Sequence, residues 1–181
     1  MKKKEFYYDS ADGVTKIHGI EWIPEGKPVC ILQIVHGMAE YINRYDRLAV
    51  FLAEKGILVT GNDHLGHGKS IYKNMEEAGN GAGSSHPYGY FCHQDPATAA
   101  VEDVQSLKKR IREENPRIPY LIMGHSMGSF ILRNYLCVYG AEIDGALSWG
   151  PVCSPKACWD FPKSWLSSSL FSREKNIKAL W

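Results

Sequence analysis

Three short apolar runs, each followed by a segment with helical features, restrict the fold of this chain more than any other feature of its sequence. The runs are VCILQIVHG, ILVTGND and YLIMGH, at residues 29–37, 57–63 and 120–125. Their length, and the β-branched residues of the first run, indicate strands buried on both faces of a parallel sheet. Strand and helix in alternation imply parallel strands joined by right-handed crossovers, with helices on both faces of the sheet.

The predicted helices have identifiable ends. They cover residues 42–55, 96–114 and 126–140. Gly56 stands where the first helix needs a C-cap, and Asp95 with Pro96 gives the second an N-cap and a proline at its first position. Gly140 closes the third. The apolar stripes predicted to face the sheet consist of Tyr45, Leu48, Ala49 and Leu52 in the first helix, and of Ala97, Ala100, Val101, Val104, Leu107 and Ile111 in the second.

Further strands are predicted at both ends of this alternating region. Residues 4–9 and 15–23 predict an antiparallel hairpin, with the turn-forming pair Asp12-Gly13 between them. The segment IDGALSWG, residues 143–150, is the last predicted strand. Residues 71–94 are rich in glycine and have little periodicity, so they predict a long loop.

The composition excludes several classes of protein. With 181 residues, 44% of them hydrophobic and 23% charged, the chain has the make-up of one ordinary globular domain. A net charge of +1 with scattered basic residues argues against a nucleic-acid partner. Because the opening MKKK is followed by EFYYDSADG and not by the apolar stretch of a signal peptide, we expect a cytoplasmic protein. The five cysteines form no C-x-x-C pair and indicate buried free thiols.

Ser126 lies between two glycines where a predicted strand meets a predicted helix. The segment Gly124-His125-Ser126-Met127-Gly128 fits G-x-S-x-G. At a sharp strand-to-helix turn the serine takes a strained backbone conformation, and Gly124 and Gly128 leave room for it. The pattern predicts a nucleophile whose hydroxyl stands clear of the sheet; the alternative is a serine N-cap with glycines present for packing.

The segment IVHGMAEYINRY closes an earlier strand and leads into a helix. Gly37, after His36, would let the backbone of Met38 turn its N–H towards Ser126. The Met38 and Met127 amides together would then form an oxyanion hole. The alternative is a tight turn before a helix.

The segment GNDHLGHGKS, with Asp63, His64 and His67, also follows a predicted strand. Two histidines three residues apart beside an aspartate raise the alternative of a metal site, but no further cluster of ligand residues accompanies them. We expect a hydrogen-bonded loop that shapes the floor of the site, with no metal.

Taken together, HGMAEYINRY, DHLGHGKS and GHSMGS, in this order and spacing, resemble the α/β-hydrolase family, and within it the monoacylglycerol lipase and lysophospholipase group of serine hydrolases. The resemblance covers about residues 15–150. It implies an α/β-hydrolase fold, Ser126 as nucleophile, and the Met38 and Met127 amides as oxyanion hole. It also implies hydrolysis of carboxylic esters of lipids through an acyl-enzyme, without a cofactor.

The sequence departs from this family after the serine. The catalytic partners of the family follow the nucleophile in the order Asp or Glu, then His, yet no histidine follows Ser126. The family would continue with a cap segment and two more strands, which the sequence after Trp149 does not resemble. We therefore expect a hydrolase core over residues 1–150, lacking the last strands and the cap, and an atypical tail over 151–181. Truncation, or a shift of reading frame near residue 148, would produce such a chain.

Several functional alternatives stay open on the sequence. The same scaffold could act as a thioesterase, acyltransferase or peptidase, because a nucleophile and an oxyanion hole do not specify the leaving group. Another alternative is a chain without catalytic activity, which would be either an inert remnant or a module that binds acyl groups. The expected partner is a small acyl ester or lipid, with peripheral membrane contact and self-association through the edge strand IDGALSWG as further expectations.

Overall fold

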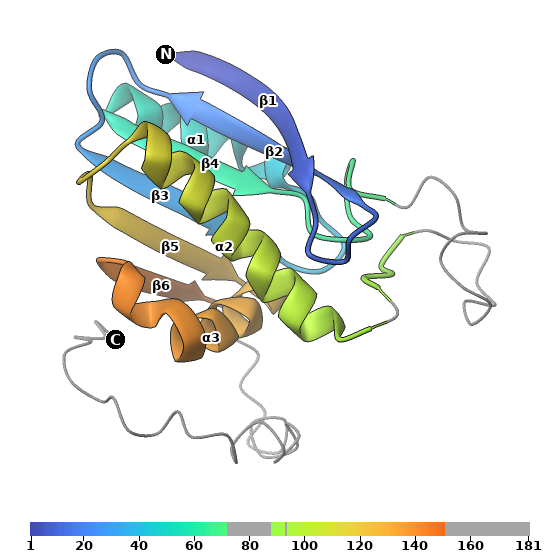
Figure 1. The fold of residues 1–181 in the computed structure, drawn as a ribbon. Helices are drawn as coiled ribbons and strands as arrows, with labels where there is room; N and C mark the ends of the chain where they lie inside the picture. The colour runs from blue at the N-terminus through green and yellow to red at the C-terminus, as the bar shows by residue number, and fades with distance from the viewer. Residues whose placement is uncertain (72–87, 93, 151–181) are drawn as a thin grey trace.

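A six-stranded sheet with helices on both faces makes up the part of the chain that the computed structural model describes, residues 1–71, 88–92 and 94–150 (Figure 1). The strands lie in the order β1-β2-β4-β3-β5-β6. Their bounds are Lys2–Asp9 for β1, Lys16–Ile23 for β2, Cys30–Val35 for β3, Ile57–Asn62 for β4, Tyr120–His125 for β5 and Gly145–Trp149 for β6.

The pairing of the strands confirms the mostly parallel sheet. β3 pairs in parallel with β4 and β5, and β5 pairs in parallel with β6. The hairpin of β1 and β2 is antiparallel, as expected, and joins the sheet through an antiparallel pairing of β2 with β4. The carboxyl ends of β3, β4 and β5 therefore lie at the same edge of the sheet, which is where open α/β sheets bind ligands.

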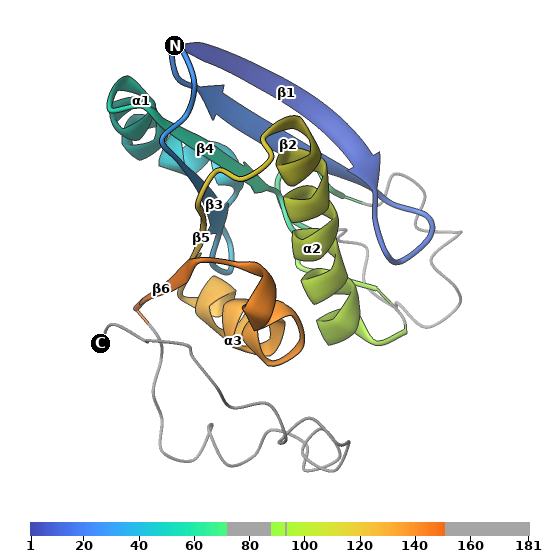
Figure 2. The ribbon, with the colours of Figure 1, turned by 60° about the vertical axis from the view of Figure 1, so that its left-hand side comes forward.

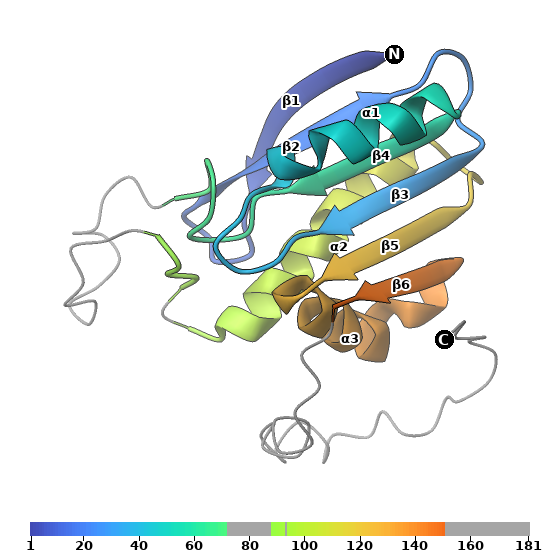
Figure 3. The ribbon, with the colours of Figure 1, turned by 180° about the vertical axis from the view of Figure 1, so that it is seen from behind.

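The helices divide between the two faces of the sheet, as the sequence predicts. α1, Asp46–Glu54, lies on one face and follows a short 3-10 turn η1, Ile42–Tyr45 (Figure 3). α2, Pro96–Glu114, and α3, Met127–Tyr139, lie side by side on the other face (Figure 2). A second 3-10 turn η2, Gly140–Glu142, leads into β6. The Asp95 cap is confirmed, since its carboxylate accepts the backbone N–H of Thr98 at 3.2 Å.

The alternation of side chains along β3 and β5 gives the sheet its two cores. Ile31, Val35 and Ile122 pack in the cluster beneath α2 and α3, whereas Ile34 and Met123 pack in the cluster beneath α1. Because successive side chains of a strand point to opposite faces, the residue after Gly124 in β5 lies on the α1 face. His125 is therefore directed towards η1 and the loop that precedes it.

The predicted helix stripes need two corrections. Leu48 is 40% exposed, whereas Ala49 is buried as predicted, together with Ala53, which the prediction omitted. Ala97 is exposed, while Ala99 is buried, where it packs with Ile17 of β2 and with Leu65. The other five residues of the predicted α2 stripe are buried.

Buried polar residues on α2 were not anticipated from the apolar stripe. Asp103 accepts hydrogen bonds from the Ser10 hydroxyl at 2.9 Å and from the Ala11 backbone N–H at 2.7 Å, and so holds the hairpin turn against α2. Burial raises the pKa of Asp103 to about 6, although these two hydrogen bonds act in the opposite direction. Most of the predicted loop 71–94, and the whole predicted tail 151–181, lie outside the described residues.

Candidate functional site

Ser126 occupies the turn between β5 and α3 with a backbone conformation that serine rarely adopts. Its φ of 51° and ψ of −118° place it in the positive-φ region, where a non-glycine residue costs about 1–3 kcal/mol. Hydrogen bonds hold the turn on both sides: the Ser126 N–H donates to the Trp149 carbonyl at 2.9 Å, and its carbonyl accepts the Ser129 N–H at 2.9 Å. The strained turn predicted for this serine is thus present, and its hydroxyl makes no capping hydrogen bond to α3.

The two glycines that flank Ser126 are required by close backbone contacts. A Cβ atom at Gly124 would lie 2.5 Å from the Gly128 carbonyl oxygen, and one at Gly128 would lie 2.0 Å from the carbonyl oxygen of Val35. Both distances are far below van der Waals contact. The G-x-S-x-G spacing therefore lets the start of α3 pack directly on the ends of β5 and β3.

The loop that follows β3 lies against this turn. A Cβ atom at Gly37 would be 3.1 Å from the Cβ of Ser126 and 3.2 Å from the His125 carbonyl oxygen. Met38 follows with a side chain that is 71% exposed, and Ala39 has a positive φ of 56°. Met127 is the first residue of α3, at the helix end where backbone N–H groups carry partial positive charge. The structure thus brings both loops of the predicted oxyanion hole together.

Glu40 connects the same two loops, a contact that the sequence analysis missed. Its Oε1 accepts the Gly37 N–H at 2.5 Å, the Tyr45 hydroxyl at 2.9 Å and the Nδ1–H of His125 at 2.9 Å. Burial raises the pKa of Glu40, but the hydrogen bonds from His125, Gly37 and Tyr45 outweigh it and hold that pKa below its ordinary value. Glu40 is therefore a carboxylate at neutral pH, in the middle of the site.

His36 also holds the loop after β3, through hydrogen bonds of both its ring nitrogens. Its Nδ1–H donates to the Gly37 carbonyl at 2.8 Å, and its Nε2 accepts the backbone N–H of His64 at 3.0 Å. Burial lowers the pKa of His36 to about 4, so the ring is neutral and both nitrogens are engaged. The loop-supporting position predicted for His36 agrees with these contacts.

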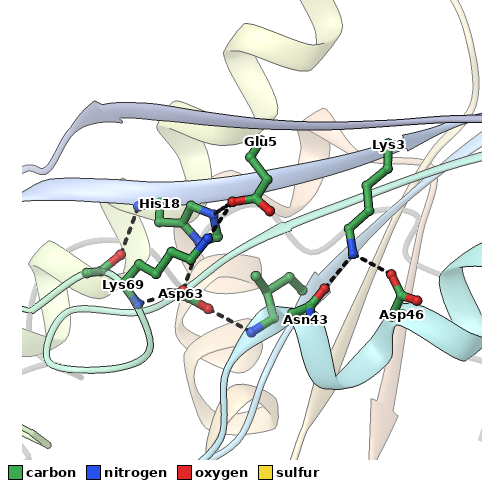
Figure 4. A network of polar contacts seen from close by, with 9 residues as sticks. Lys3, Glu5, His18, Asn43, Asp46, Asp63 and Lys69 are labelled. Atoms are coloured by element: carbon green, nitrogen blue, oxygen red, sulfur yellow. Dashed lines mark hydrogen bonds and ion pairs between the residues drawn. The ribbon is translucent and has the colours of Figure 1, made fainter.

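Asp63 organises the loop that follows β4 (Figure 4). Its Oδ1 accepts the Ile42 N–H at 2.7 Å, and its Oδ2 accepts the Lys69 N–H at 2.9 Å and the Nδ1–H of His18 at 2.8 Å. Burial raises the pKa of Asp63, but these hydrogen bonds outweigh it and lower the pKa overall. The expected hydrogen-bonded loop is present.

His18 joins this loop to the N-terminal hairpin. Its Nε2–H donates to Glu5 Oε2 at 2.9 Å, and Lys69 Nζ donates to the same oxygen at 2.6 Å (Figure 4). Burial lowers the pKa of His18, but the two carboxylates outweigh it and raise the pKa above its ordinary value. No pattern in the sequence points to His18, because its partners Glu5 and Asp63 lie on a different strand and on a distant loop.

Asp63 and His67 of the DHLGHGKS segment make hydrogen bonds within the protein. Both Asp63 oxygens already accept hydrogen bonds, and His67 Nδ1 donates to the Leu65 carbonyl at 2.9 Å. Within residues 1–71, 88–92 and 94–150, no group of three His, Cys, Asp or Glu side chains is placed to hold a metal ion. The ring nitrogens of the buried His64 have no hydrogen-bond partner in that part of the chain.

A cavity of about 630 Å³ lies beside the loop after β3. Part of its wall comes from residues 38–41 of this loop, and other parts come from Tyr88 and from the hairpin residues Glu5, His18 and Ile20. Ser126 does not line this cavity, which therefore borders the loop after β3 and not the serine hydroxyl. Three exposed apolar side chains contribute to the cavity wall, Met38, Tyr41 and Tyr88, which are 71%, 46% and 68% exposed, and so do exposed charged residues such as Glu5 and Lys69.

Most of the chain matches a known protein family. The family model described as serine aminopeptidase, S33, matches residues 26–178. Because the match includes most of residues 151–181, the division of the chain at residue 150 stays a prediction. The monoacylglycerol lipase of Mycolicibacterium smegmatis is 28% identical over 150 residues, which are 83% of this chain and 47% of that protein. The monoglyceride lipase of Rattus norvegicus is 30% identical over 110 residues, 61% of this chain and 31% of that protein.

Two solved structures, of an esterase and of a lipase, are also similar to this chain. A thermostable carboxyl esterase from Bacillus coagulans in complex with glycerol superposes with a TM-score of 0.70 at 32% identity, over 82% of this chain and 44% of that chain. A monoglyceride lipase from Saccharomyces cerevisiae has a TM-score of 0.66 at 20% identity, over 89% of this chain and 49% of that chain. The chain thus spans about half, or less, of the length of these relatives.

Proposed function

Because the chain belongs to the serine aminopeptidase S33 family of α/β-hydrolases, we propose that it is a serine hydrolase that cleaves carboxylic esters of lipids, with Ser126 as nucleophile. The single observation that carries this proposal is the conformation of Ser126, with φ 51° and ψ −118° at the strand-to-helix turn. Backbone strain at a non-glycine residue persists only where the surroundings impose it, and such positions cluster at active sites. Gly124 and Gly128 allow the close backbone packing that surrounds Ser126 here.

In the proposed reaction the Ser126 hydroxyl attacks the carbonyl carbon of the ester and transfers its proton to a base. The backbone N–H groups of Met38 and Met127 stabilise the negative oxygen of the tetrahedral intermediate. This intermediate collapses, the alcohol leaves with a proton, and the acyl group remains on Ser126 until water releases it as the acid. No histidine follows Ser126 in the sequence, so the chain's own residues account for the nucleophile and the oxyanion hole but not for a base in the family's order.

A lipid ester of the monoacylglycerol or lysophospholipid type is the proposed substrate. The names of the relatives, monoacylglycerol lipase and monoglyceride lipase, support it. The exposed side chains of Met38, Tyr41 and Tyr88, which line the cavity, also support it, because exposed apolar residues beside a site favour acyl chains or a lipid surface. Peripheral contact with a membrane is part of this proposal; among the described residues, the helices are all too short or too polar to cross a bilayer.

Cleavage of a peptide bond is the second candidate function. The description of the matching family, serine aminopeptidase, favours it. A nucleophile and an oxyanion hole act on amides as they do on esters, so the leaving group depends on residues beyond those two features. An inactive module that binds acyl groups is the non-enzymatic alternative.

Acylation of Ser126 tests the proposal directly. The purified chain is incubated with p-nitrophenyl butyrate, with an aminoacyl p-nitroanilide, or with a fluorophosphonate, and the adduct is located by mass spectrometry. We expect the fluorophosphonate and the butyryl group on Ser126, neither in Ser126→Ala, and both in Ser106→Ala, which removes an exposed serine of α2. Acylation by the anilide alone would favour the peptidase, and binding of butyrate esters without any adduct would favour the inactive module.

We further propose a cytoplasmic location and self-association through β6. The described cysteines Cys30, Cys92 and Cys137 are free thiols, which supports a reducing compartment. In the described part of the chain β6 pairs with β5 alone, and Leu147 and Trp149 on it are 49% and 69% exposed. A strand with one unpaired edge and exposed apolar side chains favours pairing with a second copy.

A further inference from the structure

Two peptide groups of the loop after β3 are held in fixed directions by side chains. The C=O of Gly37 accepts the Nδ1–H of His36 at 2.8 Å, and the N–H of Gly37 donates to Oε1 of Glu40 at 2.5 Å. Because a peptide bond is planar and trans, the C=O of Gly37 and the N–H of Met38 belong to one rigid plane and point in opposite directions. Holding both polar groups of Gly37 therefore also sets the direction of the Met38 N–H.

Glu40 reaches the nucleophile turn through the same oxygen atom. Oε1 accepts the His125 Nδ1–H at 2.9 Å, and His125 is bonded directly to Ser126 along the chain. The Tyr45 hydroxyl donates to this oxygen at 2.9 Å and lies 2.9 Å from His125 Nδ1. One carboxylate oxygen thus joins the loop after β3, the turn η1 and the end of β5.

We propose that Glu40 is a positioning residue for the oxyanion hole: it fixes the Met38 N–H relative to Ser126 by tying Gly37 to His125. The inference rests on the proposed function, since it assigns Glu40 a purpose within that site. Glu40 does not touch the reacting atoms. It acts through Gly37 and His125, which come from the two loops that supply the two backbone donors.

The burial and charge of Glu40 suit this task. Its side chain is only 11% exposed, and Arg44 Nε lies 3.9 Å from the second carboxylate oxygen. The first oxygen accepts all three hydrogen bonds, from Gly37, Tyr45 and His125. Hydrogen bonds to a charged acceptor are stronger than those between neutral groups, and a largely buried setting strengthens them further. A carboxylate with three donors on one atom is thus a stiff connection between the loop after β3 and the end of β5.

The experiment compares Glu40→Ala, Glu40→Gln and the control Glu25→Ala in the complete chain. Glu25 is 93% exposed and precedes β3, at the opposite end of that strand from Glu40. The first readout is the amide proton resonance of Gly37 and Met38 in a nitrogen-15 NMR spectrum. The second is the rate at which a fluorophosphonate labels Ser126.

We expect Glu40→Ala to move the Gly37 resonance upfield, to shift that of Met38, and to slow labelling by about 10- to 100-fold, since a misplacement of about 1 Å can cost about 100-fold. Glu40→Gln should restore most of the labelling rate, because its amide oxygen still accepts from Gly37. It should also move the Gly37 resonance part of the way upfield, because an amide is a weaker acceptor than a carboxylate. Glu25→Ala should match the parent in both readouts.

Unchanged Gly37 and Met38 resonances in Glu40→Ala would overturn the inference, as would equal labelling rates for the alanine variant and the parent. If Glu40→Ala fails to fold, the glutamine variant decides, and an unchanged Gly37 resonance in it would overturn the inference. Failure of the proposed function has a different signature. The parent would then show no label on Ser126. The Gly37 resonance would still respond to the Glu40 variants, which would support the hydrogen bond between Gly37 and Glu40.

Discussion

Gly128 lies so close to Val35 that a Cβ atom on the glycine would stand 2.0 Å from the valine carbonyl oxygen and 2.6 Å from that of His36. This contact seats the first turn of α3 on the end of β3, beside the loop that carries Gly37. The position of Ser126 over that loop therefore requires a residue without a Cβ atom at position 128.

Gly128→Ala should destabilise the chain by about 1–3 kcal/mol, the usual cost of overpacking, although alanine favours a helix more than glycine does. The free energy of unfolding, measured in urea, gives the cost. Gly145→Ala is the matched control, because its Cβ would meet only the flexible end of Leu121 at 2.8 Å. A Gly128→Ala chain as stable as the parent would mean that α3 does not pack on β3 in this way.

Val104→Asp should cost about 3 kcal/mol or more, since it places an unpaired charge where the side chain is fully buried beneath α2. Ser106→Asp introduces the same charge at an exposed position two residues away on the same helix, and should change stability little. Thermal melting of both variants beside the parent makes the comparison. Equal melting temperatures for all three chains would show that the assigned face of α2 is wrong.

Asp103→Asn should change the pH dependence of stability. Burial raises the pKa of Asp103 from 3.8 to about 6, so the folded state holds this proton more tightly than the unfolded state does. The stabilisation from the protonated group is full below pH 3.8 and is lost as the pH rises through 6, a change of about 3 kcal/mol. Asparagine cannot ionise and does not show this loss.

The stability of Asp103→Asn minus that of the parent should therefore become more positive by up to about 3 kcal/mol between pH 3.5 and pH 7. Urea unfolding at both pH values gives the four free energies needed. Glu113→Gln removes an exposed carboxyl from the same helix and serves as the control. A difference that stays constant, or becomes more negative as the pH rises, would contradict the prediction.

The 181-residue chain by itself should hydrolyse p-nitrophenyl butyrate very slowly. Loss of the base costs about a million-fold in kcat, roughly 8 kcal/mol, while an oxyanion hole and binding retain about 10³ to 10⁴ over water. His36 cannot take the place of the base, because both of its ring nitrogens are engaged, with Gly37 and with His64. Turnover near one per second that disappears in Ser126→Ala would refute the prediction, and would mean that another histidine or a partner chain accepts the proton.

Self-association should be visible by analytical ultracentrifugation at tens of micromolar. Leu147→Lys should reduce it, because a charged lysine on an edge strand disfavours pairing with another chain. Leu147 is 49% exposed on β6, so the substitution leaves the core intact. Val29→Lys, at an exposed position outside the strands, is the control. A monodisperse parent monomer at this concentration would contradict the expectation.

The local parts of the fold follow from the sequence because their causes are local. Apolar run length, helical spacing and caps such as Asp95 with Pro96 act within a few residues, and they predict the strands, the helices and the order in which they alternate. The strained turn at Ser126 belongs to this group, since Gly124 and Gly128 are its near neighbours. The face of α2 was predicted except at its start, where Ala97 is exposed and Ala99 is buried against Ile17 and Leu65, which are distant in the sequence.

The connections within the candidate site were decided only by the tertiary structure. Glu40 and His125 are 85 residues apart, and His18 and Asp63 are 45 apart, yet each pair is hydrogen bonded. No periodicity or motif spacing specifies which distant side chains will meet. By itself the sequence determined where the nucleophile turn and its neighbouring loop must occur. Their distance and orientation are set by parallel pairing, which brings the carboxyl ends of β3 and β5 to one edge of the sheet, where a buried carboxylate can bond to both loops.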